Sequence, residues 1–121
     1  MAPDNQPHRS PQPLSPLEFH VLLVLAPSQL YGYAIKKGVE EQSRGSVAPE
    51  IGSLYRSLSR LMDRGWVEES RHPPEENSPR RGKPRKYYCI TPQGLEAART
   101  EARRLREVLE TAESSLPEAA R

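Results

Sequence analysis

The stretch from Glu50 to Gly65 constrains the fold more than any other part of the sequence. Its apolar residues recur at helical spacing: Ile51, Leu54, Tyr55, Leu58, Leu61 and Met62. Its arginines follow one another four residues apart: Arg56, Arg60 and Arg64. One face of this helix therefore requires a core, whereas another offers guanidinium groups. Gly65 ends the helix, and the β-prone Trp66-Val67 pair follows at once. The pattern predicts an amphipathic helix that leads directly into a short strand.

Two further helices are predicted upstream of this stretch. Residues 15–18 have the sequence Ser-Pro-Leu-Glu, a capping box with proline at the first helical position. The helix that follows is apolar almost all round, which is typical of a central core helix, and Pro27-Ser28 ends it. Ser28 can cap a second helix that runs to about Ser43, and Pro49 can occupy the first turn of the third. Three short helices in succession predict a helix-turn-helix core.

The residues after Gly65 predict one antiparallel hairpin. Two segments rich in aromatic and branched residues, 66–70 and 85–91, suit short strands, and the Pro-rich, charged stretch between them suits a mobile tip. Tyr87 and Tyr88 should face opposite sides of their strand, so that one of them packs beneath the hairpin. Trp66 and Cys89 are expected to be core residues. Helices followed by such a hairpin predict a mainly α fold with a small β hairpin, the winged helix-turn-helix.

The last predicted helix has the most regular pattern in the chain. Thr91-Pro92 resembles a cap followed by proline at the first helical position, and the helix should run to about Ser115. Apolar residues then alternate spacings of three and four, as in a heptad seam: Leu95, Ala98, Ala102, Leu105, Leu109, Ala112 and Leu116. A domain this small has little core left to cover such a seam. We therefore expect a homodimer formed through this helix, with folding back onto its own domain as the alternative.

Composition limits what else the chain can be. With 121 residues, of which 35% are hydrophobic, it suits one domain with segments outside the core. We expect a disordered Pro-rich arm over 1–13, a winged-helix domain over 14–91, a dimerisation helix over 92–116 and a tail over 117–121. No apolar run approaches the roughly 20 residues that span a bilayer, and the first residues lack a secretory pattern. A cytoplasmic location without a membrane partner is the simplest expectation.

The sequence predicts neither catalysis nor a cofactor. His8, His20 and His72 are scattered without neighbours at metal-ligand spacing, and Cys89 is the single cysteine. No nucleophile, base and orienting acid can be grouped, and no phosphate-binding glycine loop is present. The formal net charge of +2 excludes a bulk polycation, so an anionic partner must be argued from the placement of charges. We expect no enzyme, no metal site and no cofactor.

Four short motifs in register resemble those of PadR-type transcriptional regulators. They are Leu30-Tyr31-Gly32-Tyr33-Ala34-Ile35, Gly52-Ser53-Leu54-Tyr55, Gly82-Lys83-Pro84-Arg85-Lys86-Tyr87-Tyr88 and Ile90-Thr91-Pro92-Gln93-Gly94. The resemblance covers roughly residues 14–112. It implies a winged-helix DNA-binding domain, a dimer formed through the C-terminal helix, and usually repression of nearby genes. Many members have proline after the Leu-Tyr pair, where this chain has Arg56.

Three groups of residues are then expected to contact double-stranded DNA. The helix over 50–65 would present Ser53, Arg56, Ser57 and Arg60 on its exposed side to base edges or phosphates. Tyr31 and Tyr55 could reach phosphates through their hydroxyls, with core packing as the alternative for Tyr55. The hairpin adds five cations that could follow phosphates or enter a minor groove: Arg80, Arg81, Lys83, Arg85 and Lys86. For the arginines of the helix and for the cations of the hairpin, the alternative to DNA contact is a surface that only contacts solvent.

Together these patterns predict a sequence-specific DNA-binding transcriptional regulator, a repressor, that acts as a homodimer on a roughly palindromic operator. Two alternatives stay open. The winged helix could bind a protein partner in place of DNA, or the regulator could also bind a small-molecule effector in a pocket at the dimer interface, which Trp66 could line.

Overall fold

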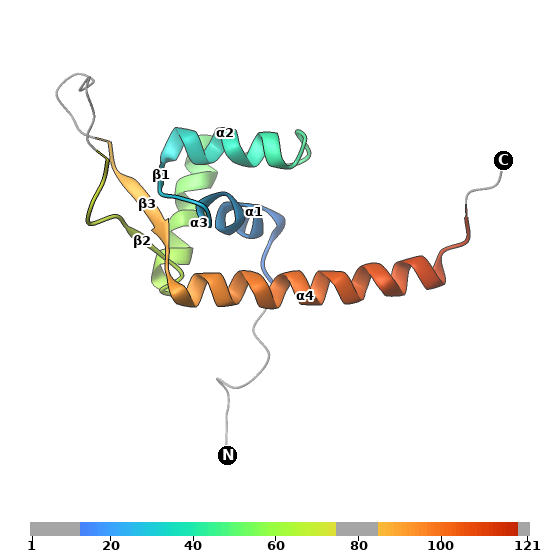
Figure 1. Ribbon diagram of the computed structural model, residues 1–121. Helices are drawn as coiled ribbons and strands as arrows, with labels where there is room; N and C mark the ends of the chain where they lie inside the picture. The colour runs from blue at the N-terminus through green and yellow to red at the C-terminus, as the bar shows by residue number, and fades with distance from the viewer. Residues whose placement is uncertain (1–12, 75–84, 119–121) are drawn as a thin grey trace, which may run out of the picture.

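The computed structural model describes residues 13–74 and 85–118, which form four helices and a small three-stranded sheet (Figure 1). In chain order the elements are α1 (Pro16–Leu25), β1 (Leu30–Tyr31), α2 (Gly32–Gln42), α3 (Ile51–Asp63), β2 (Val67–Glu69), β3 (Tyr87–Ile90) and α4 (Pro92–Ser115). This arrangement confirms the predicted winged-helix fold. No helix of the described part is long and apolar enough to cross a membrane.

Two helix starts follow the predicted caps. At α1 the Ser15 hydroxyl accepts the Glu18 N–H at 3.1 Å, and the Glu18 carboxylate accepts the Ser15 N–H at 3.0 Å, so both halves of the capping box are formed. At α4 the Thr91 hydroxyl accepts the Gly94 N–H, with Pro92 at the first helical position. These side chains satisfy backbone donors that the first turn of a helix cannot pair internally.

The predicted starts of α2 and α3 were wrong. Ser28 does not cap α2, because Leu30–Tyr31 first forms the short strand β1, and Tyr31 is then the residue at the helix N-cap. Pro49 lies outside α3, whose N-cap is Glu50. The end of α3 is as predicted, since Gly65 follows the helix with φ of +78°, a conformation that favours glycine.

The sheet has the order β1–β3–β2, with both pairings antiparallel. Val67 pairs with Ile90 across the predicted hairpin, and Leu30 pairs with Tyr88 on the other side of β3. The strand β1 was missed because two residues cannot show an alternating pattern. As expected, Tyr88 packs beneath the sheet and is buried, whereas Tyr87 is only half-buried.

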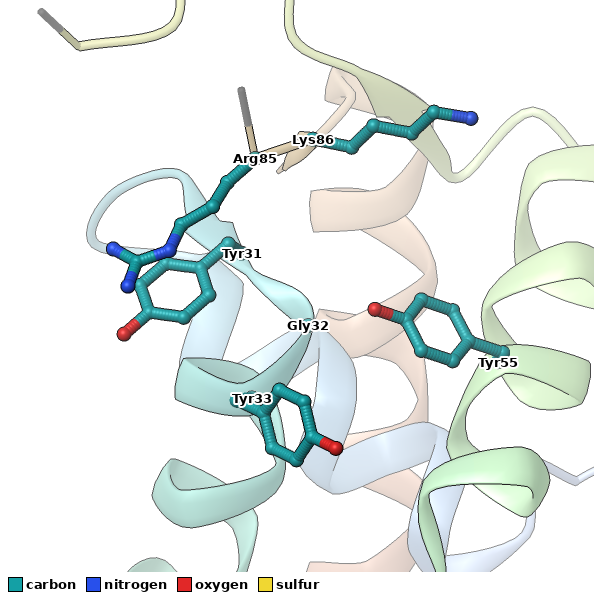
Figure 2. A pocket seen from close by; sticks show the side chains of 6 residues that line it. All are labelled: Tyr31, Gly32, Tyr33, Tyr55, Arg85 and Lys86. Atoms are coloured by element: carbon teal, nitrogen blue, oxygen red, sulfur yellow. The ribbon is translucent and has the colours of Figure 1, made fainter. Parts of the chain in front are cut away.

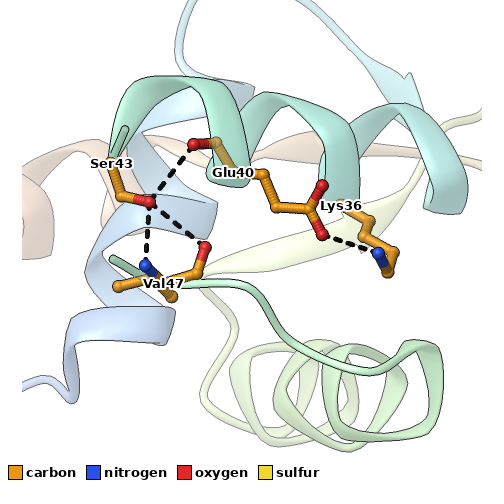
Figure 3. Close-up of polar contacts among 4 residues, drawn as sticks. All are labelled: Lys36, Glu40, Ser43 and Val47. Carbon is orange, nitrogen blue, oxygen red and sulfur yellow. Dashed lines mark hydrogen bonds and ion pairs between the residues drawn. The ribbon is translucent and has the colours of Figure 1, made fainter. Parts of the chain in front are cut away.

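The loop between α2 and α3 is fixed by Ser43, at the C-terminal end of α2 (Figure 3). Its hydroxyl accepts the Val47 N–H at 3.0 Å and lies 3.1 Å from the Val47 carbonyl oxygen. Arg44 and Gly45 make this turn with positive φ angles of 56° and 84°. Because one side chain holds both ends of this turn, α3 is set at a defined angle to α2.

The core is built around α1, as its apolar composition predicts. In Figure 1 this helix is seen nearly end-on, with α2 on one side and α4 on the other. Fully buried side chains from three helices meet there: Val21, Leu22 and Leu25 from α1, Ile35 and Val39 from α2, and Leu54, Leu58 and Leu61 from α3. The same core includes Tyr88 and Val67 from the sheet, so the helices and the hairpin form one unit.

Only the first part of α4 packs against this core. Ala98, placed by the sequence in a dimerisation seam, is instead buried with the core residues of its own domain. Glu101 is buried beside it, and its carboxylate accepts two hydrogen bonds from Arg104, at 3.0 and 2.7 Å. Beyond this point α4 extends away from the domain (Figure 1). The predicted arm over 1–13 and the hairpin tip fall largely outside the described residues.

Gly94 provides a direct test of how α4 is seated. A Cβ at this position would collide with the backbone oxygen of Trp66 and the side chain of Ile90. Gly94→Ala should therefore destabilise the domain by roughly 1–3 kcal/mol despite the higher helix propensity of alanine. Thermal unfolding checks this, with Gly52→Ala as the matched control. The nearest atom to a Cβ at Gly52 belongs to the exposed Arg56 guanidinium, at 3.7 Å. Equal melting temperatures for the two variants would contradict this packing.

Candidate nucleic-acid interface

The orientation of α3 is set by its buried stripe. Leu54, Leu58 and Leu61 point into the core, which leaves Arg56 on the outward face. Ser57, predicted on the exposed side, is only 1% exposed, because it lies one turn along from Leu54 and Leu61 at the edge of the buried stripe. Ser53, half-buried, accepts a hydrogen bond from Arg56 Nη2 at 3.1 Å. No carboxylate of the described residues pairs with the Arg56 guanidinium, so it is open to an outside acceptor.

Arg60 has a different environment from Arg56. Its Nε lies 3.4 Å from Glu18 Oε2, and its Nη2 donates to Ser57 Oγ at 3.1 Å. Burial alone would raise the pKa of the Glu18 carboxyl, but the Ser15 amide and the Arg60 guanidinium outweigh it and hold that pKa below its ordinary value. Arg60 is therefore tied to the start of α1, although its side chain remains 57% exposed.

A second group of predicted residues meets at the start of α2. The Arg85 guanidinium carbon lies 4.1 Å from the centre of the Tyr31 ring, and this ring meets Tyr87 edge-on at 5.6 Å. The guanidinium stacked on Tyr31 and the edge-on contact of Tyr31 with Tyr87 hold the base of the hairpin beside the start of α2. Figure 2 shows Arg85 lying over Tyr31, while the Tyr55 hydroxyl from α3 points toward Gly32.

These side chains line a cavity of about 410 Å³ that is open to solvent beside α3 (Figure 2). Its lining residues are Tyr31, Gly32, Tyr33, Tyr55, Arg85 and Lys86. The first turn of α2 opens at this cavity and has no side-chain cap. Helix N-termini carry partial positive charge, so backbone dipole and cationic side chains act together on an anion here.

Gly32 explains why two sequence motifs occur together. A Cβ at this position would collide with the Tyr55 hydroxyl, so glycine lets the Tyr55 side chain lie against the start of α2. Sequence reasoning identified Tyr31 and Tyr55 but missed Tyr33, whose side chain is 64% exposed at the rim of the cavity. The repeated tyrosine on either side of Gly32 was the available signal.

The other predicted residues divide into two sets. Arg85 and Lys86 lie at the cavity, whereas Arg80, Arg81 and Lys83 are outside the described residues. Burial, together with the neighbouring Glu68 carboxylate, raises the pKa of the Cys89 thiol and so favours its protonated form. Across residues 13–74 and 85–118 no cluster of His, Cys, Asp and Glu could hold a metal ion.

Comparison with known proteins places this geometry in a family context. The model of the "Transcriptional regulator PadR-like family" matches residues 21–100. A solved PadR family transcription regulator from Clostridium difficile is 21% identical with a TM-score of 0.69, over 85% of this chain and 100% of that chain. A PadR-like transcriptional regulator from Bacillus cereus is 25% identical with a TM-score of 0.66, over 85% and 93%.

A curated relative shows the same similarity in a longer protein. This is an uncharacterized 37.1 kDa protein in transposon TN4556 of Streptomyces fradiae, 38% identical over 82 residues. The matched region is 68% of this chain but 21% of that protein, so the chain spans about a fifth of its length.

The contact between Glu18 and Arg60 gives a pH-dependent prediction. The pKa of Glu18 is lowered in the folded state, so its stabilising contribution is present above its ordinary value of 4.5 and is lost as pH falls through the folded pKa. Glu18→Gln keeps a capping side chain but removes the charge, and should cost about 1 kcal/mol near neutral pH. Chemical denaturation from pH 7 to pH 3 checks this: the difference from wild type should shrink below pH 4.5. The exposed Glu41→Gln serves as control, and a constant difference for Glu18→Gln would contradict the assignment.

Proposed function

The chain belongs to the PadR-like family of transcriptional regulators, and we propose that it represses transcription as a homodimer bound to a roughly palindromic operator. The observation that carries the proposal is that the outward face of α3 and the cationic cavity at the start of α2 adjoin one another through Tyr55. Groups that can contact base edges and groups that can bind phosphate thereby share one side of the domain.

The cavity suits a phosphate of the DNA backbone. Arg85 and Lys86 supply charge, the Tyr55 hydroxyl supplies a donor, and the uncapped first turn of α2 supplies backbone dipole. Phosphate contacts hold the duplex in position but carry little sequence information. In this proposal Tyr31 acts indirectly, because its ring supports the Arg85 guanidinium.

Sequence recognition is proposed for the outward face of α3 in the major groove. Arg56 is the foremost candidate, since its guanidinium has no carboxylate partner among the described residues and can donate two hydrogen bonds to guanine. Arg60, Ser53 and Ser57 are assigned a supporting role. Ser57 is buried and Arg60 contacts Glu18, so these two help to hold α3 against the domain.

The homodimer is proposed from the outer part of α4. Four apolar side chains there are substantially exposed: Leu105 (37%), Val108 (50%), Leu109 (56%) and Leu116 (68%). Leu105, Leu109 and Leu116 continue, with Ala102 and Ala112, the stripe that packs against the core at Ala98, and Val108 lies beside it. No element of the described chain covers these side chains. A second copy would cover this stripe and place two recognition helices about 34 Å apart, one helical turn of DNA.

A ligand-responsive regulator is the second candidate function. A cavity of about 550 Å³ lies between α4 and the start of β2, with Leu14, Trp66, Ala97 and Thr100 among its lining residues. Its size and partly apolar walls suit a small organic molecule, and this response would add to DNA binding. Quenching of the fluorescence of Trp66, the single tryptophan, is the direct assay for such a ligand.

The division between specifying and phosphate-binding residues is testable on DNA. Arg56→Ala should lose about 1–3 kcal/mol of discrimination at one base pair of the operator. Lys86→Ala should instead weaken binding to all duplexes equally, and should reduce the slope of log affinity against log salt concentration by about one. Gel shifts on the promoter region and on single-base variants, at two or more salt concentrations, measure both effects. An Arg56→Ala protein with unchanged sequence preference would contradict the assigned base contact.

The outer stripe of α4 is testable by introducing one charge. Leu105→Asp should raise the dimer dissociation constant more than about a hundredfold, because each copy loses a buried leucine and gains a buried carboxylate. Thr100→Asp, on the opposite face of the same helix, is the matched control and should leave association unchanged. Sedimentation analysis at micromolar concentration makes the comparison. If both variants remain dimeric, the interface lies elsewhere.

A further inference from the structure

The cavity beside Trp66 lies where the N-terminal arm joins the domain. It is lined by Leu14, by Trp66 and by α4 residues between Gln93 and Glu107. Residues 1–12, the part of the predicted arm outside the described residues, end two positions before Leu14. We propose that this cavity is a docking groove for the arm of the same chain, with Pro11 packed against Trp66. The inference goes beyond the proposed function, because it requires neither DNA nor a second copy.

The arm starts inside the groove that it is proposed to fill. Leu14 lines the groove, is only 8% exposed and belongs to the core, so the point at which the arm leaves the domain is fixed. A segment tethered beside its binding site by a short linker has a local concentration of about a millimolar or more. A contact too weak to hold a separate peptide is therefore sufficient for the arm of the same chain.

The sequence of the arm favours an extended segment of the right reach. Proline has a fixed φ, and the residue before a proline is disfavoured in helical conformations, so Pro11 and Pro13 together restrict residues 10–13 to extended backbone. In a polyproline II segment every third residue shares a face, which places Pro11 on the side of Leu14 that lines the groove. At about 3.1 Å per residue, Pro11 is about 9 Å from Leu14. The α4 wall from Gln93 to Glu107 is about 21 Å long, so this reach stays within the groove.

The walls of the groove suit proline. Trp66 is half-buried, and the Arg64 guanidinium lies 4.9 Å from the centre of its ring, a contact that holds the ring in place. Along α4 the groove is lined by the small side chains of Ala97 and Thr100, which let a proline ring approach the helix. Proline-rich segments bind aromatic-lined grooves because their extended conformation loses little entropy on binding. The same pairing of chemistry is present between Pro11 and Trp66.

The charges of the lining favour this segment over an acidic one. The lining has an excess of one carboxylate, with three glutamates and two arginines: Glu96, Glu101, Glu107, Arg103 and Arg104. Glu101 is paired with Arg104, whereas Glu107 forms no ion pair in residues 13–74 and 85–118. Within residues 7–13 the arm has one residue of fixed positive charge, Arg9, and no acidic residue. Attraction between the arm and this lining adds to the apolar contact.

Docking of the arm leaves the proposed dimer surface free. Ala97, Thr100 and Arg104 follow one another at spacings of three and four, so they share one face of α4, whereas Ala102 and Leu105 lie on another. The arm would cover the first face only. A small organic ligand of the kind proposed above would have to displace the arm from the groove before it could bind.

The fluorescence of Trp66, the single tryptophan, tests the contact in the full chain. Pro11→Gly should raise the acrylamide quenching constant about twofold, because the indole ring loses the proline that covers it. Pro3→Gly removes a proline from the same arm but outside the docked segment, and should leave quenching unchanged. Unchanged melting temperatures of both variants show that the domain is intact. If Pro11→Gly is quenched like wild type, or if both variants change equally, the proposal is overturned.

A disulfide bond locates the arm independently. In a Cys89→Ser background, Pro11→Cys combined with Ala97→Cys should form a bond within one chain under mild oxidation. Its yield should exceed by about tenfold that of Pro11→Cys combined with Ala102→Cys, because a disulfide needs the two Cα atoms within about 7 Å. Mass analysis separates bonds within a chain from bonds between chains. Equal yields for the two pairs would show an arm outside the groove, and bonds mainly between chains would place it in the groove of another copy. Either result overturns the proposal.

Discussion

The burial of α1 is the constraint on which the whole domain depends. This helix is apolar on nearly every side, so it is stable only when other elements surround it, and α2, α3, α4 and β3 all contact it. Its one charged buried residue, Glu18, is used twice, once for the capping box and once for Arg60 of α3. The proposed recognition helix, packed through its buried leucines, is thereby also linked to the start of the central helix.

Two glycines explain how these elements approach so closely. Gly32 allows the Tyr55 side chain of α3 to reach the start of α2, and Gly94 allows the first turn of α4 to contact the backbone at Trp66. Both lie in short motifs that carry the family resemblance. The motifs are thus steric requirements of the packing, and the tyrosines beside Gly32 are brought to one cavity by the same requirement.

Local chemistry could be predicted from the sequence, whereas features that depend on a distant partner could not. The caps at Ser15 and Thr91 and the glycine stop at Gly65 depend on residues within a few positions, and all three were confirmed. The strand β1 exists only because Leu30 and Tyr31 pair with β3, far along the chain. Ser57 and Ala98 were misplaced for a related reason. Helical periodicity finds an apolar stripe, but the neighbouring helices decide how wide it is and where it ends.

The stripe of α4 joins the stability of the domain to its assembly. Ala98, near the start of the stripe, is buried in the core of its own domain. Leu105 and Leu109, further along the stripe, are exposed, and in the proposed dimer a second copy covers them. Since α4 packs against α1, and α1 is tied to α3 through Glu18 and Arg60, the position of α3 is determined relative to α4 within each chain. In the proposed dimer the separation of the two recognition helices then follows from the register of the α4 pair. A shift by one heptad would move them by about 10 Å, a large fraction of the 34 Å between successive major grooves. In the proposed dimer the pairing of α4 is consequently a determinant of operator spacing.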